Sequence, residues 1–411
     1  MEEKTIVIVG AGVAGVSAAE ALRENGFKGG IVLLSRENTM PYDRPPLSKE
    51  ALKACSSSAT FLLRDETFYE ANNIDLRLGV SATSIDPHGH VLTLSNNTYL
   101  TYDKLLLATG SRARTLPLFP YASPGIHYLR TLNDAQRLKD DMEKLPQDAN
   151  MVIVGAGIIG LEVAAAAATQ GLTVTVIETG ERPLGRSGSP FLAHFLAEKH
   201  TEHGVRILCN THIINVEKCH SGYCLSLSND TQILANLVVV GVGVCPELEL
   251  STLAGIDVTP AGIKVDAQGR TTIKDIYAAG EVAFHHNMHY GTQRRDETWQ
   301  HAASHGAHVA KAMIGAPDDY STLGSYWTDQ YDLNIQVIGN PLGTSEVVRG
   351  NPDTEGCLIF HLDDSTICGI TAINSTRALR KLRRLVVNSA SIPIEVLADP
   401  ESDLQNYQPT H

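Results

Sequence analysis

The clearest pattern along the chain is an apolar run followed by a glycine-rich turn and an alanine-rich stretch, and it occurs twice. The first copy has its apolar run at residues 5–9 and its turn at 10–15, and the second has them at 151–154 and 155–160. An uninterrupted apolar run bounded by glycine is typical of a strand in a parallel sheet, so each copy predicts a strand, a turn and a helix. The turns begin 145 residues apart (155 − 10), which indicates a duplicated domain.

Further apolar runs extend this pattern, and its character changes near residue 320. The expected strands before that point are 31–34, 102–110, 173–177, 236–243 and 272–281. Beyond it the runs shorten and alternate with polar residues, at 334–338, 358–360 and 370–373, which predicts an antiparallel α+β domain. The predicted fold class is therefore α/β, with two Rossmann-like dinucleotide-binding domains and a C-terminal α+β domain.

The two turns share the spacing G-x-G-x-x-G, which lets the backbone approach a pyrophosphate at the N-terminus of the following helix. One such match is weak evidence, because glycine turns also serve only to pack helices on strands. Two matches in strand–turn–helix context predict two dinucleotides. The glycines concerned are Gly10, Gly12 and Gly15 in the first loop, and Gly155, Gly157 and Gly160 in the second.

The residue that ends the second strand of each copy indicates which dinucleotide is bound. Glu178 lies 18 residues past Gly160, where an acid accepts the ribose hydroxyls of NAD and repels the 2′-phosphate of NADP. The alternative is a solvated acid at a strand end. The first copy is less regular, because Arg36 and Glu37 stand at the equivalent place.

Composition excludes several other classes of protein. The 411 residues suggest about 2.7 domains of ordinary size, and the formal charge of −13 argues against general nucleic-acid binding. No apolar run approaches the roughly 20 residues of a membrane span. The seven cysteines form no C-x-x-C pair, so we expect a reducing compartment, the cytoplasm, and no disulfide framework.

Several segments together resemble a known family. The two glycine loops, 108–110 and 276–281 resemble the two-dinucleotide flavoprotein reductases. Within these, the chain is similar over essentially its whole length to the ferredoxin reductases of bacterial oxygenase systems (the putidaredoxin-reductase-like family), above all the reductase component of aromatic-ring-hydroxylating dioxygenases. The segments that carry this likeness are 41–49 (PYDRPPLSK), 128–131 (YLRT), 296–299 (DETW) and 326–330 (YWTDQ).

The resemblance implies FAD on the first glycine loop and NAD on the second. It also implies which residues bind these cofactors: Gly10, Gly12, Ala14, Gly15, Arg36, Glu37, Lys49, Ala82, Arg130, Gly280, Glu281 and Trp299 for FAD, and Gly155, Gly157, Ile159, Gly160, Glu162 and Glu178 at the second loop and its helix.

Lys49, Glu162 and Trp299 are the candidate catalytic residues that the resemblance implies. The family pairs Lys49, beside the flavin, with Glu162; the cation favours the reduced, anionic flavin and the carboxylate keeps the lysine charged. A plain interhelix salt bridge is the alternative for Glu162. Trp299 is the candidate for packing at the flavin edge, and a core tryptophan is its alternative.

Two residues depart from the family pattern, and one feature of related enzymes is missing. Glu281 stands where the family usually has Asp, and Arg36 replaces an acid near the adenosine ribose; Glu37 is the candidate substitute. Disulfide reductases of this fold need a cysteine in the loop after the second strand, and residues 38–49 contain none. Cys55 lies six residues beyond Lys49 and is expected to be inert or exposed.

Histidines are concentrated near the tryptophan motif. His301, His305 and His308 have the spacing i, i+4, i+7, while His285, His286 and His289 form a second group. Such spacing can bind a metal. The family has no metal here, so we expect polar surface and no metal site.

The sequence therefore predicts an NADH-dependent FAD enzyme that reduces a [2Fe–2S] ferredoxin, which in turn supplies an aromatic-ring-hydroxylating dioxygenase. The alternatives are a reductase for a cytochrome P-450 ferredoxin or a rubredoxin, an NADH oxidase or disulfide reductase, and a flavoprotein used for binding or signalling. The expected domains are 1–112 with 243–317 for FAD, 113–242 for NAD, and 318–411 at the C-terminus. The oligomeric state is left open.

A basic helix is predicted at residues 375–385, with Ser375 or Thr376 as its N-cap. Its inward stripe would be Leu379, Leu382, Leu385 and Val386. Its outward face is the predicted ferredoxin-docking surface, because the protein as a whole is acidic; a solvated face with intramolecular partners is the alternative. This basic face comprises Arg377, Arg380, Lys381 and Arg384. The next candidates for docking are Arg294 and Arg295.

Overall fold

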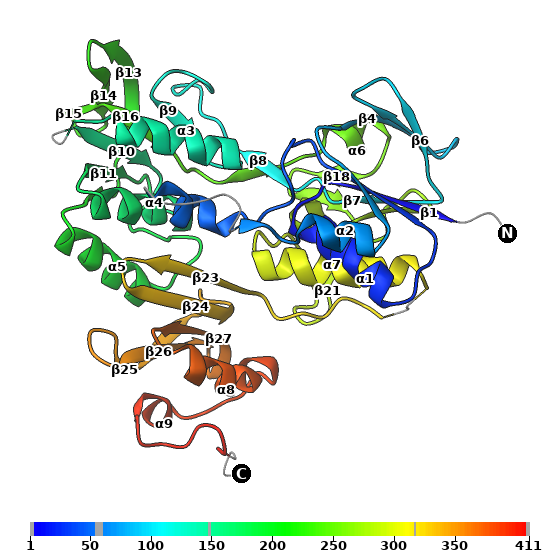
Figure 1. Cartoon of the computed structure of the whole chain (residues 1–411). Helices are drawn as coiled ribbons and strands as arrows, with labels where there is room; N and C mark the ends of the chain where they lie inside the picture. Colours follow the sequence, from blue (N-terminus) through cyan, green and yellow to red (C-terminus); the bar gives the residue numbers. More distant parts are fainter. Residues whose placement is uncertain (1–3, 54–60, 147–148, 316–317, 408–411) are drawn as a thin grey trace. The chain divides into compact units, whose positions relative to one another are not determined.

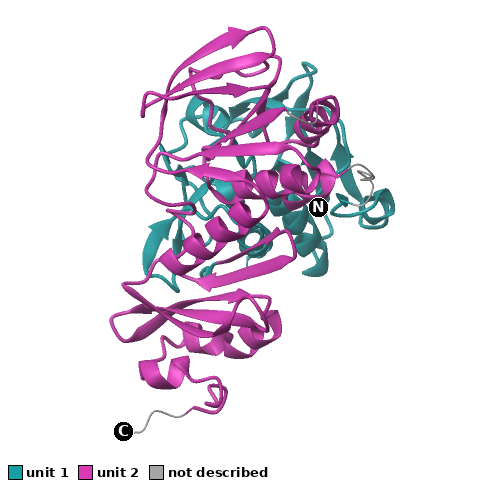
Figure 2. Cartoon of the chain, turned by 90° about the vertical axis from the view of Figure 1, so that its left-hand side faces the viewer, with its two compact units in different colours: residues 1–44, 57–112, 244–324 teal, residues 45–56, 113–243, 325–411 magenta. Residues whose placement is uncertain are grey.

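The computed structural model describes residues 4–53, 61–146, 149–315 and 318–407 (Figure 1). The chain divides into two compact units, coloured separately in Figure 2. Unit 1 comprises residues 1–44, 57–112 and 244–324, and unit 2 comprises 45–56, 113–243 and 325–411. Each unit is therefore assembled from three separate stretches of sequence.

Unit 1 is built on a five-stranded parallel sheet with the order β20-β7-β1-β2-β3. Alternate residues of β1 point to opposite faces: Ile6 and Ile8 join a core with helices α1 and α7, whereas Val7 and Val9 join a second core on the other face. The elements are β1 (Thr5–Val9), α1 (Val13–Glu24), β2 (Gly30–Leu34), β3 (Ile74–Arg77), β7 (Lys104–Leu107), β20 (Ile276–Ala278) and α7 (Trp299–Met313).

Smaller elements of unit 1 surround this sheet. One antiparallel sheet has the order β4-β5-β6, another has β18-β19-β21-β22, and β8 pairs with β17. Their bounds are α2 (Glu66–Ala71), β4 (Ala82–Asp86), β5 (Val91–Leu94), β6 (Tyr99–Thr101), β8 (Ser111–Ala113), β17 (Val244–Pro246), α6 (Glu249–Leu253), β18 (Val258–Thr259), β19 (Gly262–Lys264), η4 (Gly280–Val282), β21 (Ala283–Asn287) and β22 (Thr292–Arg294).

Unit 2 contains a second five-stranded parallel sheet, with the order β12-β11-β10-β16-β9, and a three-stranded sheet β13-β14-β15 that shares a core with it. The elements are η1 (Pro45–Ser48), η2 (Glu50–Leu52), β9 (Ile126–Tyr128), α3 (Leu132–Glu143), β10 (Asn150–Val154), α4 (Ile158–Thr169), β11 (Thr173–Ile177), α5 (Pro190–Glu202), β12 (Arg206–Leu208), β13 (Ile213–Cys219), β14 (Gly222–Leu227), β15 (Gln232–Ala235) and β16 (Leu237–Val240).

The C-terminal part of unit 2 is a five-stranded antiparallel sheet with the order β23-β24-β27-β26-β25, on which helix α8 packs. Its elements are β23 (Ser325–Gln330), β24 (Leu333–Gly339), β25 (Ser345–Asn351), β26 (Gly356–Asp363), β27 (Thr366–Ile373), α8 (Thr376–Val387) and α9 (Ile394–Ala398).

The predicted fold class is confirmed: both strand–turn–helix copies exist, and the antiparallel region follows them. The expected strand at 272–281 is much shorter, because Asp275 adopts a positive φ of 63° and only Ile276–Ala278 pairs with β7. The three-domain division stays a prediction. Among the described residues, no helix is both long enough and apolar enough to cross a bilayer.

Candidate functional site

In the first glycine loop, close contacts require two of the three glycines. Gly10 has a φ of 115°, and a β-carbon there would collide with the carbonyl oxygen of Ala108. A β-carbon on Gly15 would collide with the carbonyl oxygen of Gly10, so this glycine lets α1 approach the strand closely. At Gly12, by contrast, a β-carbon would meet nothing within 4 Å. The first and third glycines therefore serve packing, and the second leaves open space at the N-terminus of α1.

The second loop repeats this division. Gly155 has a φ of 102°, and a β-carbon there would collide with the carbonyl oxygen of Gly241. A β-carbon on Gly160 would collide with the carbonyl oxygen of Gly155, whereas one on Gly157 would meet nothing within 4 Å. Ile159, in the first turn of α4, is 44% exposed although it is an aliphatic residue in an apolar helix.

Both loops fit the pyrophosphate of a dinucleotide. Gly12 and Gly157 are the N-caps of 12-residue helices, and neither offers a side chain to the first-turn N–H groups. Those donors, together with the positive end of the helix dipole, point into the space that the second glycine leaves open. The chain thus carries two separate places for an anionic dinucleotide.

Glu178 lies next to the second loop, where the spacing placed it. One carboxylate oxygen (Oε2) accepts a hydrogen bond from the backbone N–H of Ala156 at 2.7 Å, and Oε1 accepts one from Gly180 at 2.7 Å. The carboxylate is therefore held by the loop backbone. A role in recognising ribose stays a prediction.

At the equivalent place in the first copy, the structure distinguishes Glu37 from Arg36. Glu37 is bound by the hydroxyl of Tyr42 at 2.5 Å and by the guanidinium of Arg44 at 2.9 Å. Arg36 is 70% exposed and lies 3.5 Å from Glu247. Glu37 is thus fixed by two neighbours, while Arg36 extends over the surface of unit 1.

Another group of predicted residues gathers where α1 meets η4 and α7. A β-carbon on Gly280 would lie 2.6 Å from that of Ala14, and the N–H of Gly280 donates to Nδ1 of His305 at 3.1 Å. The carboxylate of Glu281 is 3.9 Å from the guanidinium of Arg295. Ala82, the first residue of β4, belongs to a different sheet of unit 1.

Trp299 is the first residue of α7, and its side chain contacts Asp43, a residue of the PYDRPPLSK motif. Its indole N–H donates to the carboxylate of Asp43 at 2.6 Å. Burial raises the pKa of Asp43, and the hydrogen bond from Trp299 opposes that rise. Trp299 is therefore held by a specific polar contact, in addition to any packing.

In unit 2 the structure brings Lys49 and Glu162 together, as the motif predicted. The ammonium of Lys49 is 3.4 Å from Glu162, and both side chains are buried, with exposures of 9% and 3%. Ser48 donates to one oxygen of Glu162, and Thr328 donates to the other at 2.7 Å. Burial raises the pKa of Glu162, whereas Lys49 and the two hydroxyls favour the charged form.

A second acid beside Lys49 was missed by the sequence analysis. The carboxylate of Asp329 lies 3.1 Å from the ammonium, closer than Glu162 does. Asp329 and Thr328 both lie in 326–330, a segment to which the family resemblance alone assigns no role. The sequence feature that could have indicated these contacts is the run of polar residues in strand β23, because polar side chains in a partly buried strand need hydrogen-bond partners.

Arg130 lies between β9 and α3 in unit 2. Its backbone N–H donates to Asp134, which also forms the capping box of α3 with Thr131. A role at FAD stays a prediction.

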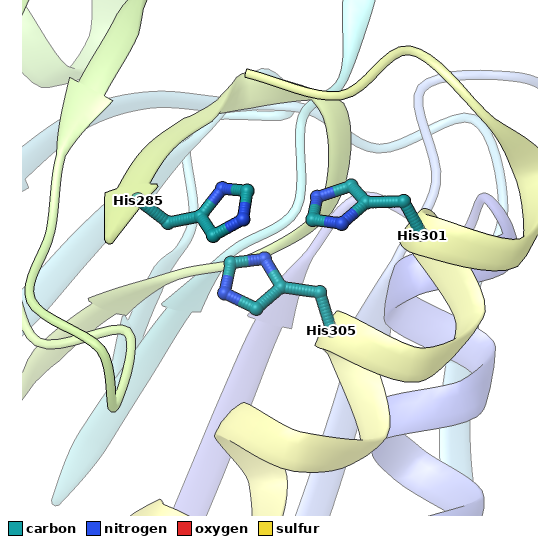
Figure 3. A group of neighbouring side chains, drawn as sticks. All are labelled: His285, His301 and His305. Carbon is teal, nitrogen blue, oxygen red and sulfur yellow. The ribbon is translucent and has the colours of Figure 1, made fainter. Parts of the chain in front are cut away.

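The expectation that the histidines form polar surface is wrong for three of them. His285, His301 and His305 are buried and their side chains point toward one another (Figure 3). Their ring centroids are 4.6 to 4.9 Å apart; the rings of His285 and His301 are stacked, and that of His305 is tilted against both. Burial lowers the pKa of His285 to about 4 and that of His301 to about 3, and it also lowers the pKa of His305. All three are thus neutral at pH 7.

One nitrogen from each of these histidines lies within 4.8 Å of the others, a spacing that could hold a metal. His305, however, already uses the lone pair of Nδ1 to accept the Gly280 N–H, so its Nε2 carries the proton. His301 Nδ1 lies 3.2 Å from the hydroxyl of Tyr320. The absence of a metal site stays a prediction.

The basic face of α8 is arranged as predicted. Leu379, Leu382, Leu385 and Val386 are buried, and Ser375 is the N-cap, although without a side-chain cap bond. The four cations of the face are exposed, and no ion pair joins them to an acid among the described residues. The nearby carboxyl of Asp403 has its pKa lowered by hydrogen bonds, chiefly from Asn406, and also by the charge of Arg384. By contrast, Arg294 and Arg295 are ion-paired with Asp296 and Glu297.

Comparison with known proteins adds to this geometry. Residues 4–306 match the family described as pyridine nucleotide-disulphide oxidoreductase, and residues 325–408 match the family described as reductase C-terminal. The chain is 37% identical over 392 residues (95% of this chain and 98% of the relative) to the 3-phenylpropionate/cinnamic acid dioxygenase ferredoxin–NAD(+) reductase component of Photorhabdus laumondii. It is 38% identical over 409 residues (99% and 100%) to the anthranilate 1,2-dioxygenase system ferredoxin–NAD(+) reductase component of Burkholderia cepacia.

Among solved structures, the ferredoxin reductase for the CYP199A2 system from Rhodopseudomonas palustris superposes with a TM-score of 0.93 at 32% identity, covering 98% of this chain and 99% of that one. The reductase in the covalent putidaredoxin reductase–putidaredoxin complex gives 0.90 at 30% identity, covering 96% of each chain.

Proposed function

The chain belongs to the pyridine nucleotide-disulphide oxidoreductase family, and from this premise we propose that it transfers electrons from NADH to a [2Fe–2S] ferredoxin of an aromatic-ring-hydroxylating dioxygenase system. The observation that carries the proposal is the pair of matching glycine cradles in one chain, each open at its second glycine. The relatives named as dioxygenase reductase components, similar along nearly the whole chain, support the choice of partner.

Membership of the family confirms the predictions of an oxidoreductase, of FAD and of NAD. We propose that FAD lies on the first loop in a domain of residues 1–112 and 243–317, and NAD on the second in 113–242. Residues 318–411 would form the third domain. A cytoplasmic location is likewise proposed; the six described cysteines are free thiols, and Cys55 lies outside the described residues.

A bound FAD would supply the redox chemistry, namely uptake of a hydride from NADH and release of single electrons to the ferredoxin. The protein's own part is then to hold two rings in position and to set the charge around them, which needs no general acid or base. We propose that Gly12 and the N-terminus of α1 hold one pyrophosphate and that Glu178 selects the unphosphorylated ribose. Trp299, fixed by Asp43, would bound the flavin edge, and Lys49 would favour the anionic reduced state.

Two further assignments belong to this proposal. The basic face of α8 would receive the acidic ferredoxin, since its cations are exposed and carry no described ion-pair partner. A cytochrome P-450 system is the second candidate source of the ferredoxin, because the two solved relatives above serve the CYP199A2 system and bind putidaredoxin. An NADH oxidase or disulfide reductase is disfavoured, because residues 38–49 contain no cysteine.

The test uses purified full-length protein. We expect it to be yellow, to release FAD on denaturation, and to reduce both ferricyanide and a [2Fe–2S] ferredoxin with NADH. Protein that stays colourless after incubation with FAD would contradict the cofactor assignment. Protein that binds FAD and reduces ferricyanide or oxygen, but none of the ferredoxins of dioxygenase or cytochrome systems, would contradict the partner.

A further inference from the structure

Lys49 interacts with two carboxylates that differ in environment. Glu162 is almost completely buried in α4, whereas the side chain of Asp329 in β23 is 41% exposed. Glu162 is satisfied locally, because the hydroxyls of Ser48 and Thr328 occupy its two oxygens. Asp329 uses only one oxygen for Lys49, at 3.1 Å, so its other oxygen can form a second contact.

That second contact leads away from Lys49 to the neighbouring strand. Asn334 in β24 lies directly opposite Asp329 in the antiparallel pairing, and its side-chain N–H donates to Asp329 Oδ1 at 2.6 Å. Because the carboxylate can only accept, it fixes the orientation of the Asn334 amide, which leaves the amide oxygen facing the other way. This oxygen accepts from the hydroxyl of Thr376 at 2.9 Å, and Thr376 is the first residue of α8.

Asn334 also holds the turn that precedes α8. Its backbone N–H donates to the side chain of Asn374 at 2.8 Å, and its carbonyl oxygen accepts from the N–H of Asn374 at 2.8 Å. Asn374 has a positive φ of 52°, a conformation that needs such local support. The N-cap Ser375 makes no side-chain cap bond, and Asn334 supports the start of α8 through its bonds to Asn374 and Thr376.

We propose that Asp329 and Asn334 are positioning residues that join Lys49 to the start of the basic helix α8 through one hydrogen-bonded chain, Lys49–Asp329–Asn334–Thr376. This inference rests on the proposed function. Asp329 then has two roles: it partly neutralises the cation that tunes the flavin, and it orients the amide that fixes the helix on which ferredoxin docks. Reduction of the flavin and docking of the ferredoxin both depend on this carboxylate.

The decisive variant is Asp329→Asn, which keeps the shape and removes the charge. Lys49 would be less neutralised and would stabilise the anionic reduced flavin more strongly, so the flavin midpoint potential should become more positive. We expect about a tenfold change in the reduction equilibrium, which is about 30 mV for a two-electron couple. Asp332→Asn is the matched control, because Asp332 is an exposed acid on the same hairpin that takes no part in the chain of contacts.

A second variant separates the two roles. Asn334→Ala leaves the Lys49–Asp329 pair in place but cuts the connection to Thr376. It should leave the flavin potential unchanged and raise the KM for the ferredoxin of the anthranilate 1,2-dioxygenase system about fivefold, with NADH–ferricyanide turnover retained. Asp329→Asn should show both effects, and circular dichroism checks that each variant is folded.

The inference is overturned if Asp329→Asn has the same potential and the same ferredoxin KM as Asp332→Asn. Lys49→Met distinguishes this failure from a failure of the proposed function. If Lys49→Met makes the potential more negative while Asp329→Asn does nothing, Lys49 acts on the flavin without Asp329. If neither variant changes the potential, the proposed role of Lys49 is itself wrong.

Discussion

In the proposed function, the carboxylate of Glu178 would have both a structural and a selective role. Its two oxygens are held by the N–H groups of Ala156 and Gly180, so the negative charge is fixed beside the open space at Gly157. A 2′-phosphate brought to that place would meet a charge that cannot move away. The proposed selectivity for NADH would therefore rest on the fixed position of the carboxylate as much as on its charge.

We predict that Glu178→Gln narrows the preference for NADH over NADPH about tenfold, which corresponds to about 1.4 kcal/mol of lost repulsion. The amide oxygen can still accept one backbone hydrogen bond, so the loop should stay in place. The measurement is kcat/KM for both nucleotides with ferricyanide. Glu181→Gln, an exposed acid three residues on, is the control and should leave the ratio unchanged. Equal kcat/KM for both nucleotides in the wild type would contradict the assignment.

Site residues could be predicted where a motif fixes them and not where the tertiary structure supplies the partner. Lys49 and Glu162 follow from the family motif, and their 3.4 Å contact agrees with it. Asp329 lies 280 positions from Lys49 in sequence, and no periodicity connects the two. The prediction that these histidines form polar surface fails for a related reason: helical spacing places His301 and His305 on one face, but only the tertiary structure shows that His285 covers that face.

At the scale of single elements, the apolar pattern of α8 predicts its structure more directly than its function. Its four buried aliphatic residues make the helix orientation unambiguous, and the basic face follows from that orientation. Short strands are harder to predict. The sheets β4-β5-β6 and β13-β14-β15 were not anticipated, because their half-exposed strands of three to seven residues carry weak patterns that only pairing resolves.

For α8 we predict that Arg380→Glu with Lys381→Glu lowers the rate of ferredoxin reduction at low ionic strength about tenfold, while NADH–ferricyanide turnover is unchanged. Charges at the rim of an interface act mainly on the association rate, so the loss should shrink as salt is added. Stopped-flow reduction of ferredoxin over a range of salt concentrations measures it.

The control must change the net charge by the same amount elsewhere on unit 2. Arg206→Glu with Lys218→Glu does so, because both residues are exposed on strands β12 and β13. If this control slows ferredoxin reduction as much as the α8 variant does, overall charge and not the basic face governs the encounter.

At the scale of the whole molecule, the buried histidines predict how the protein responds to acid. In the folded state they resist protonation, with pKa values of about 4 for His285 and about 3 for His301, whereas unfolded histidine titrates near 6.5. Below pH 6.5 the unfolded chain therefore binds more protons than the folded one. The free energy of unfolding then decreases as the pH is lowered, until the pKa values of the folded state are reached. Well above pH 6.5, where the histidines are neutral in both states, these groups contribute no pH dependence.

We predict that His285→Phe reduces the loss of unfolding free energy between pH 7 and pH 5.5 by about 1 kcal/mol. Both ring nitrogens of His285 are buried without a hydrogen-bond partner among the described residues, so an apolar ring leaves no donor or acceptor unpaired. Urea unfolding followed by FAD release measures the change. His220→Phe, at an exposed histidine, should keep the wild-type slope. An unchanged slope in His285→Phe would mean that other groups govern the acid response.

Helix α1 packs on α7, and the contact is close enough that a β-carbon on Gly306 would collide with the carbonyl oxygen of Ala14. The two helices are nearly three hundred residues apart in the chain. On a ribosome adding about 5 to 20 residues per second, α7 emerges roughly 15 to 60 seconds after α1. During that interval all the strands of the sheet β12-β11-β10-β16-β9 are already synthesised, while α1 still exposes the apolar side that α7 will cover. Helix α1 is thus synthesised long before the helix that covers it, and nascent chains stalled before residue 299 should need chaperone protection at α1.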